Sequence, residues 1–220
     1  MTKNLIIIGT GMLAEVAISY FKEYTNYSIK GVACHKEYKK SDKIFNLDLF
    51  DIETLHETHS PKDYLIFIAI GYNKMNKVRE KIYMELKNKD YKFATFIHPD
   101  VNIWDSTTIG ENVLILENNT IQPFTSIGNN TIIWSGNHFG HHGKIGDHCF
   151  ISSHVVISGY CDINNNVFIG VNSTIKDGIK ISEATLIGAG SLVMKNTIKK
   201  EVLISPRTKP FAKNSDQINF

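Results

Sequence analysis

Isoleucine recurs every sixth residue along nearly half of the chain, and this period constrains the fold more than any other feature. From Ile103 to Val193, sixteen positions share one unbroken register, and fourteen of them are Ile. Neither a helix (period 3.6) nor an alternating strand (period 2) requires a strict period of six. A parallel β-helix does, because each six residues form a short strand and a turn whose Ile points toward the coil axis. With three faces in each coil of roughly 18 residues, the register predicts about five coils of a left-handed β-helix.

The N-terminal part of the chain has another pattern, in which short apolar runs alternate with segments of helical spacing. The expected strands are Leu5–Ile8, Tyr27–Cys34, Tyr64–Ile70 and Lys92–Ile97, and the expected helices are Met12–Tyr20 and Asn73–Lys89. This alternation predicts an α/β domain with a small Rossmann-like parallel sheet. Because His98-Pro99 interrupts the pattern, we expect residues 1–97 to form this domain and residues 98–220 to form the β-helix. The polar tail, Glu201–Phe220, should pack on the last coil or on a neighbouring subunit.

Charge and cysteine usage narrow the possible partners. The net charge is +2, from 24 basic and 22 acidic residues, which gives no electrostatic footprint for nucleic acid or for a membrane surface. The three cysteines form no C-x-x-C motif, so a reducing cytoplasm fits best. The first apolar run is too short for a signal peptide or a membrane span. We therefore expect a cytoplasmic protein that binds neither nucleic acid nor membranes.

Two strand-to-helix turns of the α/β domain are candidates for binding a phosphorylated ligand. Both would lie at the carboxyl edge of the sheet, where backbone N–H groups and a helix N-terminus attract anions. The dinucleotide fingerprint is incomplete, because Ala14 stands at its third glycine and Cys34-His35 replaces the acidic residue after the second strand. A nucleotide diphosphate is therefore favoured over NAD, and turns without a ligand remain the alternative. The candidate residues are Gly9, Thr10, Gly11, Gly71, Asn73 and Lys74.

Five of the nine histidines are clustered in the β-helix. They are His138, His141, His142, His148 and His154. One interpretation is a general base, since the ordinary pKa of histidine suits proton transfer near neutrality; the others are metal ligation and exposed surface histidines. In zinc hydratases with this type of coil, two of the ligand histidines are five residues apart and a third lies about two coils earlier. No pair here is five apart, and no histidine precedes the cluster within the coils, so we expect no metal.

The densest part of the cluster reads His141-His142-Gly143-Lys144-Ile145-Gly146-Asp147. This stretch, and the pairing of a small α/β domain with a hexapeptide β-helix, resemble the NeuD/PglD-like sugar acyltransferases over almost the whole chain. The resemblance implies that His141 is the catalytic base, because the family histidine stands five residues before the Gly of an Ile-Gly corner. It also places His142 at the position of an acidic residue that supports the base, and we expect His138 to contact the substrate.

Further stretches match the family where acetyl-CoA lies. They are Ser158-Gly159, Ile169-Gly170-Val171-Asn172-Ser173 and Ile187-Gly188-Ala189-Gly190-Ser191. The resemblance implies that the pantetheine arm runs in a narrow groove that small residues keep open. The expected contacts of acetyl-CoA are Gly159, Gly170, Val171, Gly188 and Ala189. The segment Gly9-Thr10-Gly11-Met12-Leu13 departs from the family pattern Gly-x-Gly-Gly-His, and Cys34-His35 replaces an acidic pair that holds the nucleobase or ribose.

The resemblance implies an acetyl-CoA-dependent N-acetyltransferase that acts on a nucleotide-linked amino sugar. The product would serve bacterial O-antigen, capsule or protein-glycan synthesis, and the enzyme would be a homotrimer with active sites between subunits. Two alternatives remain open. One is a sugar O-acetyltransferase of the sialic-acid type, because the same base serves amines and hydroxyls. The other is a non-catalytic nucleotide-sugar binding or assembly protein.

Overall fold

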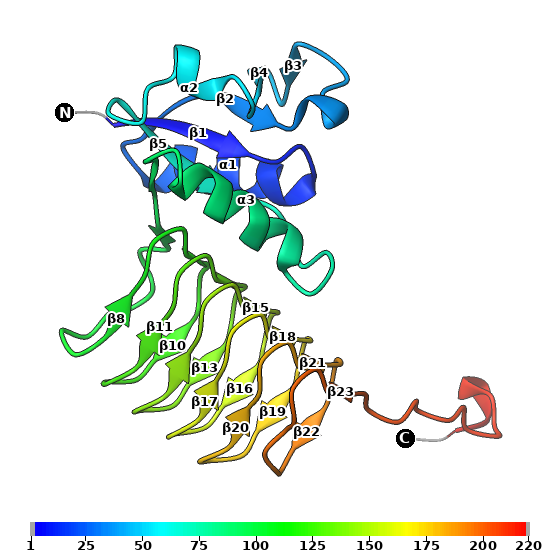
Figure 1. Cartoon of the computed structure of the whole chain (residues 1–220). Helices are drawn as coiled ribbons and strands as arrows, with labels where there is room; N and C mark the ends of the chain where they lie inside the picture. Colours follow the sequence, from blue (N-terminus) through cyan, green and yellow to red (C-terminus); the bar gives the residue numbers. More distant parts are fainter. Residues whose placement is uncertain (1–2, 219–220) are drawn as a thin grey trace.

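The computed structural model describes residues 3–218 and joins a small α/β domain to a long parallel β-helix (Figure 1). The α/β domain contains β1 (Asn4–Ile8), α1 (Met12–Tyr24), β2 (Ser28–Cys34), the 3₁₀ helix η1 (Lys36–Tyr38), β3 (Lys43–Ile44), β4 (Leu47–Asp51), α2 (Leu55–Thr58), β5 (Tyr64–Ile68), α3 (Lys77–Lys87) and β6 (Lys92–Phe93). The strand order is β3-β4-β2-β1-β5-β6, and only β3 and β4 are antiparallel. The expected α/β domain is confirmed, and the β3–β4 hairpin is an addition to it.

The alternation of side chains along β1 explains why helices cover both faces of the sheet. Leu5 and Ile7 pack with the buried side of α1, whereas Ile6 and Ile8 pack with residues of α2 and α3. All four side chains are fully buried, as expected for a parallel sheet covered on both faces. Helix α3 lies between this sheet and the β-helix (Figure 1).

Helix α3 begins at Lys77, so the predicted start four residues earlier is wrong. The residues just before it form one left-handed turn: Lys74, Met75 and Asn76, with φ of 51°, 53° and 64°. Met75 fits the apolar spacing of a helix, but Asn76 is buried and donates a hydrogen bond to the carbonyl of Val167 at 3.2 Å. Left-handed backbone costs free energy in L-residues, so contacts with the β-helix here outweigh the local helix preference.

The predicted strand Lys92–Ile97 is two strands in different sheets. Its first part, β6, pairs with β5 in the α/β domain, whereas β7 (Phe96–Ile97) pairs with a strand of the β-helix. Thr95 lies at the bend between them. Its hydroxyl donates to the carbonyl of Gly110 and accepts from the N–H of Val113, which holds the chain against the first coil. A continuous apolar run concealed this change of sheet.

The β-helix has three faces, each made of strands two residues long. The β9 face contains β7, β9 (Leu114–Ile115), β12 (Ile132–Ile133), β15 (Phe150–Ile151), β18 (Phe168–Ile169), β21 (Leu186–Ile187) and β23 (Val202–Leu203). The β10 face contains β10 (Thr120–Ile121), β13 (His138–Phe139), β16 (Val156–Ile157), β19 (Thr174–Ile175) and β22 (Leu192–Val193). The β8 face contains β8 (Thr108–Ile109), β11 (Ser126–Ile127), β14 (Lys144–Ile145), β17 (Asp162–Ile163) and β20 (Lys180–Ile181).

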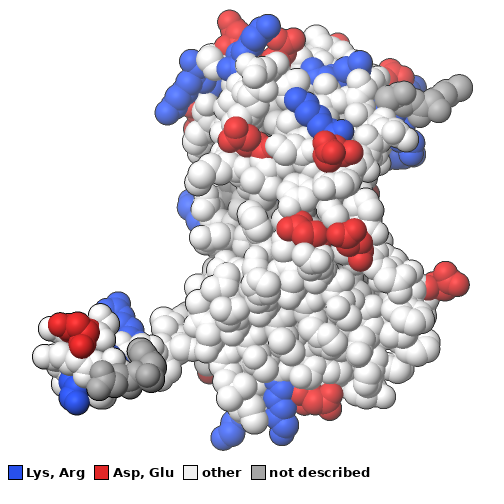
Figure 2. Space-filling model, turned by 180° about the vertical axis from the view of Figure 1, so that it is seen from behind, with Lys and Arg blue, Asp and Glu red and all other residues white. Residues whose placement is uncertain are grey.

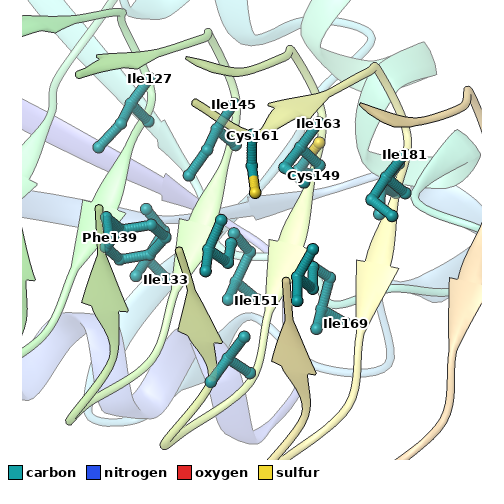
Figure 3. Packing of buried hydrophobic residues seen from close by; sticks show 14 of the residues in the cluster. Ile127, Ile133, Phe139, Ile145, Cys149, Ile151, Cys161, Ile163, Ile169 and Ile181 are labelled. Carbon is teal, nitrogen blue, oxygen red and sulfur yellow. The ribbon is translucent and has the colours of Figure 1, made fainter. Parts of the chain in front are cut away.

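The six-residue register of isoleucine forms the core of this β-helix. Along each face, register residues pair with those a full coil further on, as Ile133 does with Ile151. The side chains stack inside the coils, with Phe139 in the column of one face (Figure 3). Such stacking buries apolar surface continuously along the coil axis. The predicted parallel β-helix is therefore confirmed.

The C-terminal segment packs on the coils only at its start. Its strand β23 pairs with β21 through Ile187 and Leu203, so it continues the β9 face. Beyond β23 the chain leads away from the coils and ends in the 3₁₀ helix η2 (Ser215–Gln217), as Figure 1 shows. Within the described residues, this end of the tail does not pack on the last coil, and Phe211 is 73% exposed.

Each corner between two faces contains residues in the left-handed conformation. The His142 corner, between the β10 and β8 faces, contains Phe124, His142 and Tyr160. The Asn130 corner, between the β8 and β9 faces, contains Asn112, Asn130, His148 and Asn166. The Asn172 corner, between the β9 and β10 faces, contains Asn118, His154 and Asn172. Asn and His are among the non-glycine residues that adopt this conformation most readily.

The Asn130 corner is joined to the α/β domain by one buried arginine. Arg79, in α3, is fully buried, and its guanidinium uses all five of its N–H donors on backbone carbonyls. The acceptors are the carbonyls of Ile70, Gly71, Asn130, His148 and Cys149, at 2.7–3.1 Å. Burial lowers the pKa of Arg79 to about 9, so the group is protonated at neutral pH. The loop after β5 and two coils of the β-helix are thereby held together.

His148 is a neutral imidazole in the same interface. The amide nitrogen of Asn130 lies 2.8 Å from Nδ1 of His148, so the amide donates and the imidazole accepts. Burial lowers the pKa of His148 below its ordinary value of 6.5. Four charged groups modify this effect: Glu80 and Asp147 oppose it, whereas Arg79 and Lys77 add to it. Protonation would therefore place a cation in an interface that already contains Arg79.

We expect the chain to lose stability as the pH falls below the ordinary histidine value of 6.5. A lowered pKa means that the folded state binds fewer protons than the unfolded state, so the free energy of unfolding decreases with falling pH. His148→Asn removes this titration and introduces the residue that occupies the corner at Asn112, Asn130 and Asn166. Thermal unfolding at about pH 8 and about pH 5.5 should show a smaller decrease in midpoint for the variant. Equal decreases would assign the acid sensitivity to other groups.

Candidate active site

A cleft of about 1090 Å³ opens at the carboxyl edge of the α/β sheet. It brings together all of the residues that the sequence placed at a phosphorylated ligand in this domain. These are Gly9, Thr10, Gly11, Gly71, Asn73 and Lys74. His35, Glu37 and Tyr38 form part of the lining as well. The two turns singled out from the sequence thus line one cavity.

The turn after β1 is shaped for an anion. Gly9 has a φ of 127°, and a Cβ there would lie 2.7 Å from the carbonyl oxygen of Ala69, so only glycine fits. Gly11 caps the thirteen-residue helix α1, and no side chain caps the first N–H groups of this helix. Uncapped N–H groups and the helix dipole together favour a phosphate at this position.

Three lysines add positive charge to the cleft. Lys74 precedes α3, whereas Lys77 and Lys81 lie four residues apart on the same side of that helix and line the same cavity. Lys77 also pairs with Glu80 at 2.7 Å. The sequence reading missed Lys77 and Lys81, because lysines on an amphipathic helix usually belong to the solvent face. The spacing of three and four residues from Lys74 to Lys77 to Lys81 could have indicated that the three lysines lie on one side of the helix.

The cleft lies over the β9 face of the β-helix. Tyr72, which lines it, packs against Phe150 and Phe168 on that face, with ring centroids 4.9 and 4.7 Å apart. No residue of the His142 corner lines the cleft. Because that corner joins the other two faces, the cleft and the histidine pair lie on different sides of one chain.

His141 and His142 form a hydrogen-bonded pair at the His142 corner. Their Nδ1 atoms are 3.1 Å apart, so one imidazole donates and the other accepts. The ring of His142 stacks between those of Phe124 and Tyr160, at 4.6 and 5.0 Å. The backbone N–H of His141 donates to Oε1 of Gln122 at 2.9 Å. His142 is thus fixed by stacking and in turn orients His141.

The imidazole of His141 lies over Gly159, one coil further on. A Cβ at Gly159 would be 3.1 Å from Cε1 and 3.2 Å from Nε2 of His141, so glycine keeps this space open. The same point lies 3.1 Å from Oδ1 of Asp177, one coil beyond Gly159. The sequence reading missed Asp177, although the 18-residue spacing of the three residues places them in one column.

The other predicted contacts of acetyl-CoA lie at a different corner. Gly170 and Val171 stand beside the Asn172 corner, and Gly188 and Ala189 stack on them one coil later. A Cβ at Gly170 would lie 2.6 Å from the backbone nitrogen of Ala189, which explains why this residue is small. Within one chain, Gly159 alone of the five predicted contacts adjoins His141.

His138 is the remaining predicted substrate residue. It lies in β13 on the β10 face, where it pairs with Thr120 and Val156 in the neighbouring coils. Its side chain is half-buried and lies outside the cleft of the α/β domain. The structure therefore separates His138 from the other predicted substrate residues of the same chain.

In the described part of the chain, residues 3–218, no group of three or more His, Cys, Asp or Glu side chains is arranged to hold a metal ion. Over the same residues, no helix has the length and apolar character needed to cross a membrane.

Two family models match the chain. The model described as the PglD N-terminal domain matches residues 4–86, and the model described as bacterial transferase hexapeptide (six repeats) matches residues 124–159. A search of curated proteins found no match.

Several solved structures have the same two-part fold. PerB from Caulobacter crescentus, solved with CoA and GDP-perosamine, is 21% identical, with a TM-score of 0.81 over 92% of this chain and 94% of its own. The acetyltransferase domain of PglB from Neisseria gonorrhoeae is 18% identical, with a TM-score of 0.80 over 91% and 96% of the two chains. WeeI from Acinetobacter baumannii is 17% identical, with a TM-score of 0.77 over 92% and 94%.

Proposed function

We propose that this NeuD/PglD-like acyltransferase acetylates the amine of a nucleotide-linked sugar, with acetyl-CoA as the donor. Its chain joins a PglD N-terminal domain to a hexapeptide-repeat β-helix. The observation that carries this proposal is the imidazole of His141, which lies against the open space over Gly159. The solved structures of PerB with CoA and GDP-perosamine support the same pair of substrates.

The histidine pair supplies the base. We assign the shared proton to Nδ1 of His141, which donates to Nδ1 of His142. Nε2 of His141 then carries the lone pair and faces the space over Gly159. His142 orients the imidazole of His141, as an acidic residue does in the family. A neutral imidazole orients the base without adding negative charge, so positioning contributes more here than electrostatic stabilisation of the imidazolium.

The reaction is acyl transfer to nitrogen. The amine nitrogen attacks the thioester carbonyl carbon, its N–H proton passes to Nε2 of His141, and the C–S bond breaks. The proton then passes to the CoA sulfur, so the products are an acetamido sugar and free CoA thiol. The oxyanion needs an N–H donor. Gly159 suits this role, because its own N–H has no acceptor among residues 3–218.

The cleft binds the nucleotide diphosphate in this proposal. The N–H groups at the start of α1 and the side chains of Lys74 and Lys81 supply the positive charge for two phosphates. The ammonium group of Lys77, which also lines the cleft, is held by Glu80 and Asn166. The sugar extends from the diphosphate out of the cleft. Since His141 lies on another side of the same chain, the sugar reaches the base of a neighbouring copy.

A homotrimer with closed threefold symmetry meets this requirement, because each copy then supplies a cleft to one neighbour and a base to the other. Two features support such an assembly. The column of Phe124, His142 and Tyr160 is exposed, with Phe124 and Tyr160 each 58% exposed. On the face shown in Figure 2, charged side chains gather on the α/β domain and the β-helix surface is mainly uncharged.

A thiol-release assay tests the function directly. Acetyl-CoA would be combined with UDP-, dTDP-, GDP- and CDP-linked 3-amino and 4-amino sugars, and with free and CMP-linked sialic acid. Fast release of CoA with one nucleotide amino sugar, and mass spectrometry showing an added acetyl group on nitrogen, is the expected result. Turnover on hydroxyl acceptors alone would replace the proposal with O-acetylation. No turnover and no binding of acetyl-CoA would refute acyl transfer.

A further inference from the structure

Two polar groups from neighbouring coils approach the Cα of Gly159. Nε2 of His141 lies 3.2 Å from the position of a Cβ there, and Oδ1 of Asp177 lies 3.1 Å from it. The three residues follow one another at 18-residue intervals, so the coil geometry fixes their order along the column.

The base and the carboxylate are spaced to share a ligand atom. Because both lie within 3.2 Å of one point, they are at most about 6 Å apart. Across residues 3–218 no ion pair joins them, and Asp177 has no other ion-pair partner. An atom that hydrogen-bonds to both groups at about 2.9 Å spans about 5 Å between them. The separation of the two groups therefore allows one nitrogen or oxygen to bridge them, provided that this atom stands at van der Waals distance from the Cα of Gly159.

We infer that Asp177 binds the acceptor amine through a second N–H and thereby selects amines over hydroxyls. This inference rests on the proposed acetyl transfer. A neutral amine has two N–H donors, one for Nε2 of His141 and one for the carboxylate. A hydroxyl has one, so it leaves either the base or the carboxylate without a partner, which costs free energy where the neighbouring copy of the proposed trimer excludes water. The choice between amine and hydroxyl, open in the sequence, is assigned by Asp177.

The two protons have different fates. The N–H that faces His141 is lost to Nε2 as the C–N bond forms. The N–H that faces Asp177 stays on nitrogen and becomes the amide N–H of the product. Asp177 accordingly takes no proton from the amine in this step. It acts by holding the nitrogen so that its lone pair points at the thioester carbon.

The test compares Asp177→Ala and Asp177→Asn with the wild type on two matched ligands. These are the nucleotide amino sugar that the wild type acetylates fastest and its analogue with a hydroxyl in place of the amine. We expect Asp177→Ala to lower kcat/KM for the amine by about 10–10²-fold, because a charge-assisted hydrogen bond is lost. The Kd of the hydroxyl analogue, measured by calorimetry with CoA present, should change less than about threefold. For Asp177→Asn, kcat/KM for the amine should lie between the values of the wild type and Asp177→Ala, because the amide oxygen still accepts a hydrogen bond.

Asp105→Asn is the matched control. Asp105 is an exposed carboxylate at the same register position, two coils before His141, whereas Asp177 lies two coils after it. Asp105→Asn should leave kcat/KM for the amine and Kd for the hydroxyl analogue unchanged. Equal losses for the amine and the hydroxyl analogue in Asp177→Ala, or a higher KM for acetyl-CoA alone, would overturn the inference while acetyl transfer stands. A wild type that acetylates no amine in the panel would instead refute the proposed function.

Discussion

Replacing His141 with Ala or Asn is expected to lower kcat by about 10²–10⁴-fold, the usual contribution of a positioned general base. The imidazole is exposed at a corner and packs in no core, so the fold should tolerate its loss. Steady-state thiol release, with circular dichroism to verify folding, measures the effect. His154→Asn is the control, since His154 is another exposed histidine, at a different corner. Unchanged turnover in the His141 variants would move the base elsewhere.

The same variant tests whether the site is shared between copies. Gly11→Phe should block the cleft without strain, because no atom lies within 4 Å of a Cβ at that position. Mixed with His141→Ala chains in equal amounts, it should restore about a quarter of wild-type activity, since one site in four then combines an intact cleft with an intact base. Each variant alone should be inactive. A mixture without activity would place the cleft and the base of one site in one chain.

Replacing Arg79 with Met is expected to destabilise the protein by about 3–5 kcal/mol, because it leaves buried carbonyl groups without donors. For a chain of this size this corresponds to a fall in the thermal midpoint of roughly 6–20 °C. Calorimetry should also show the α/β domain separating from the β-helix as an additional transition. Since Arg79 bonds the carbonyls of Ile70 and Gly71 at the cleft, KM for the nucleotide sugar should rise more than kcat falls.

The chain offers a matched control for this experiment. Its other arginine, Arg207, is exposed in the C-terminal segment, so Arg207→Met makes the same chemical change outside the interface. It should leave the midpoint within about 1–2 °C of the wild type. Arg79→Lys keeps the charge but has three donors on one nitrogen, and it should recover only part of the loss. A wild-type midpoint in Arg79→Met would show that the interface does not depend on this residue.

The sequence predicts most of the architecture because two strong periodicities report burial directly. The register that starts at Ile103 fixes the β-helix, and the apolar runs at Leu5–Ile8 and Tyr64–Ile70 fix the central strands. The structure differs from the predicted elements where contacts between residues distant in sequence determine the backbone conformation. Asn76 sits in a left-handed turn that binds the β-helix, and Thr95 breaks an apolar run between two sheets. Neither effect has a local signature.

The candidate site is predicted in part for a similar reason. Gly9 and Gly71 belong to turns with recognisable chemistry, and they line one cleft as expected. Lys81 is indistinguishable in sequence from a solvent-facing lysine until the helix is placed. Asp177 becomes visible when the six-residue register is grouped into coils of three faces, because this grouping stacks it over Gly159 and His141.

The hydrogen bonds of Arg79 between the two domains also determine the position of the cleft along the coil axis. Arg79 binds the carbonyls of Asn130 and His148, which flank His141 in sequence by less than one coil on either side. The cleft is therefore anchored level with the base along the coil axis, although it faces another direction. A threefold axis parallel to the coils turns each copy without shifting it along that axis. Sugar and base would then meet at the same level in every site.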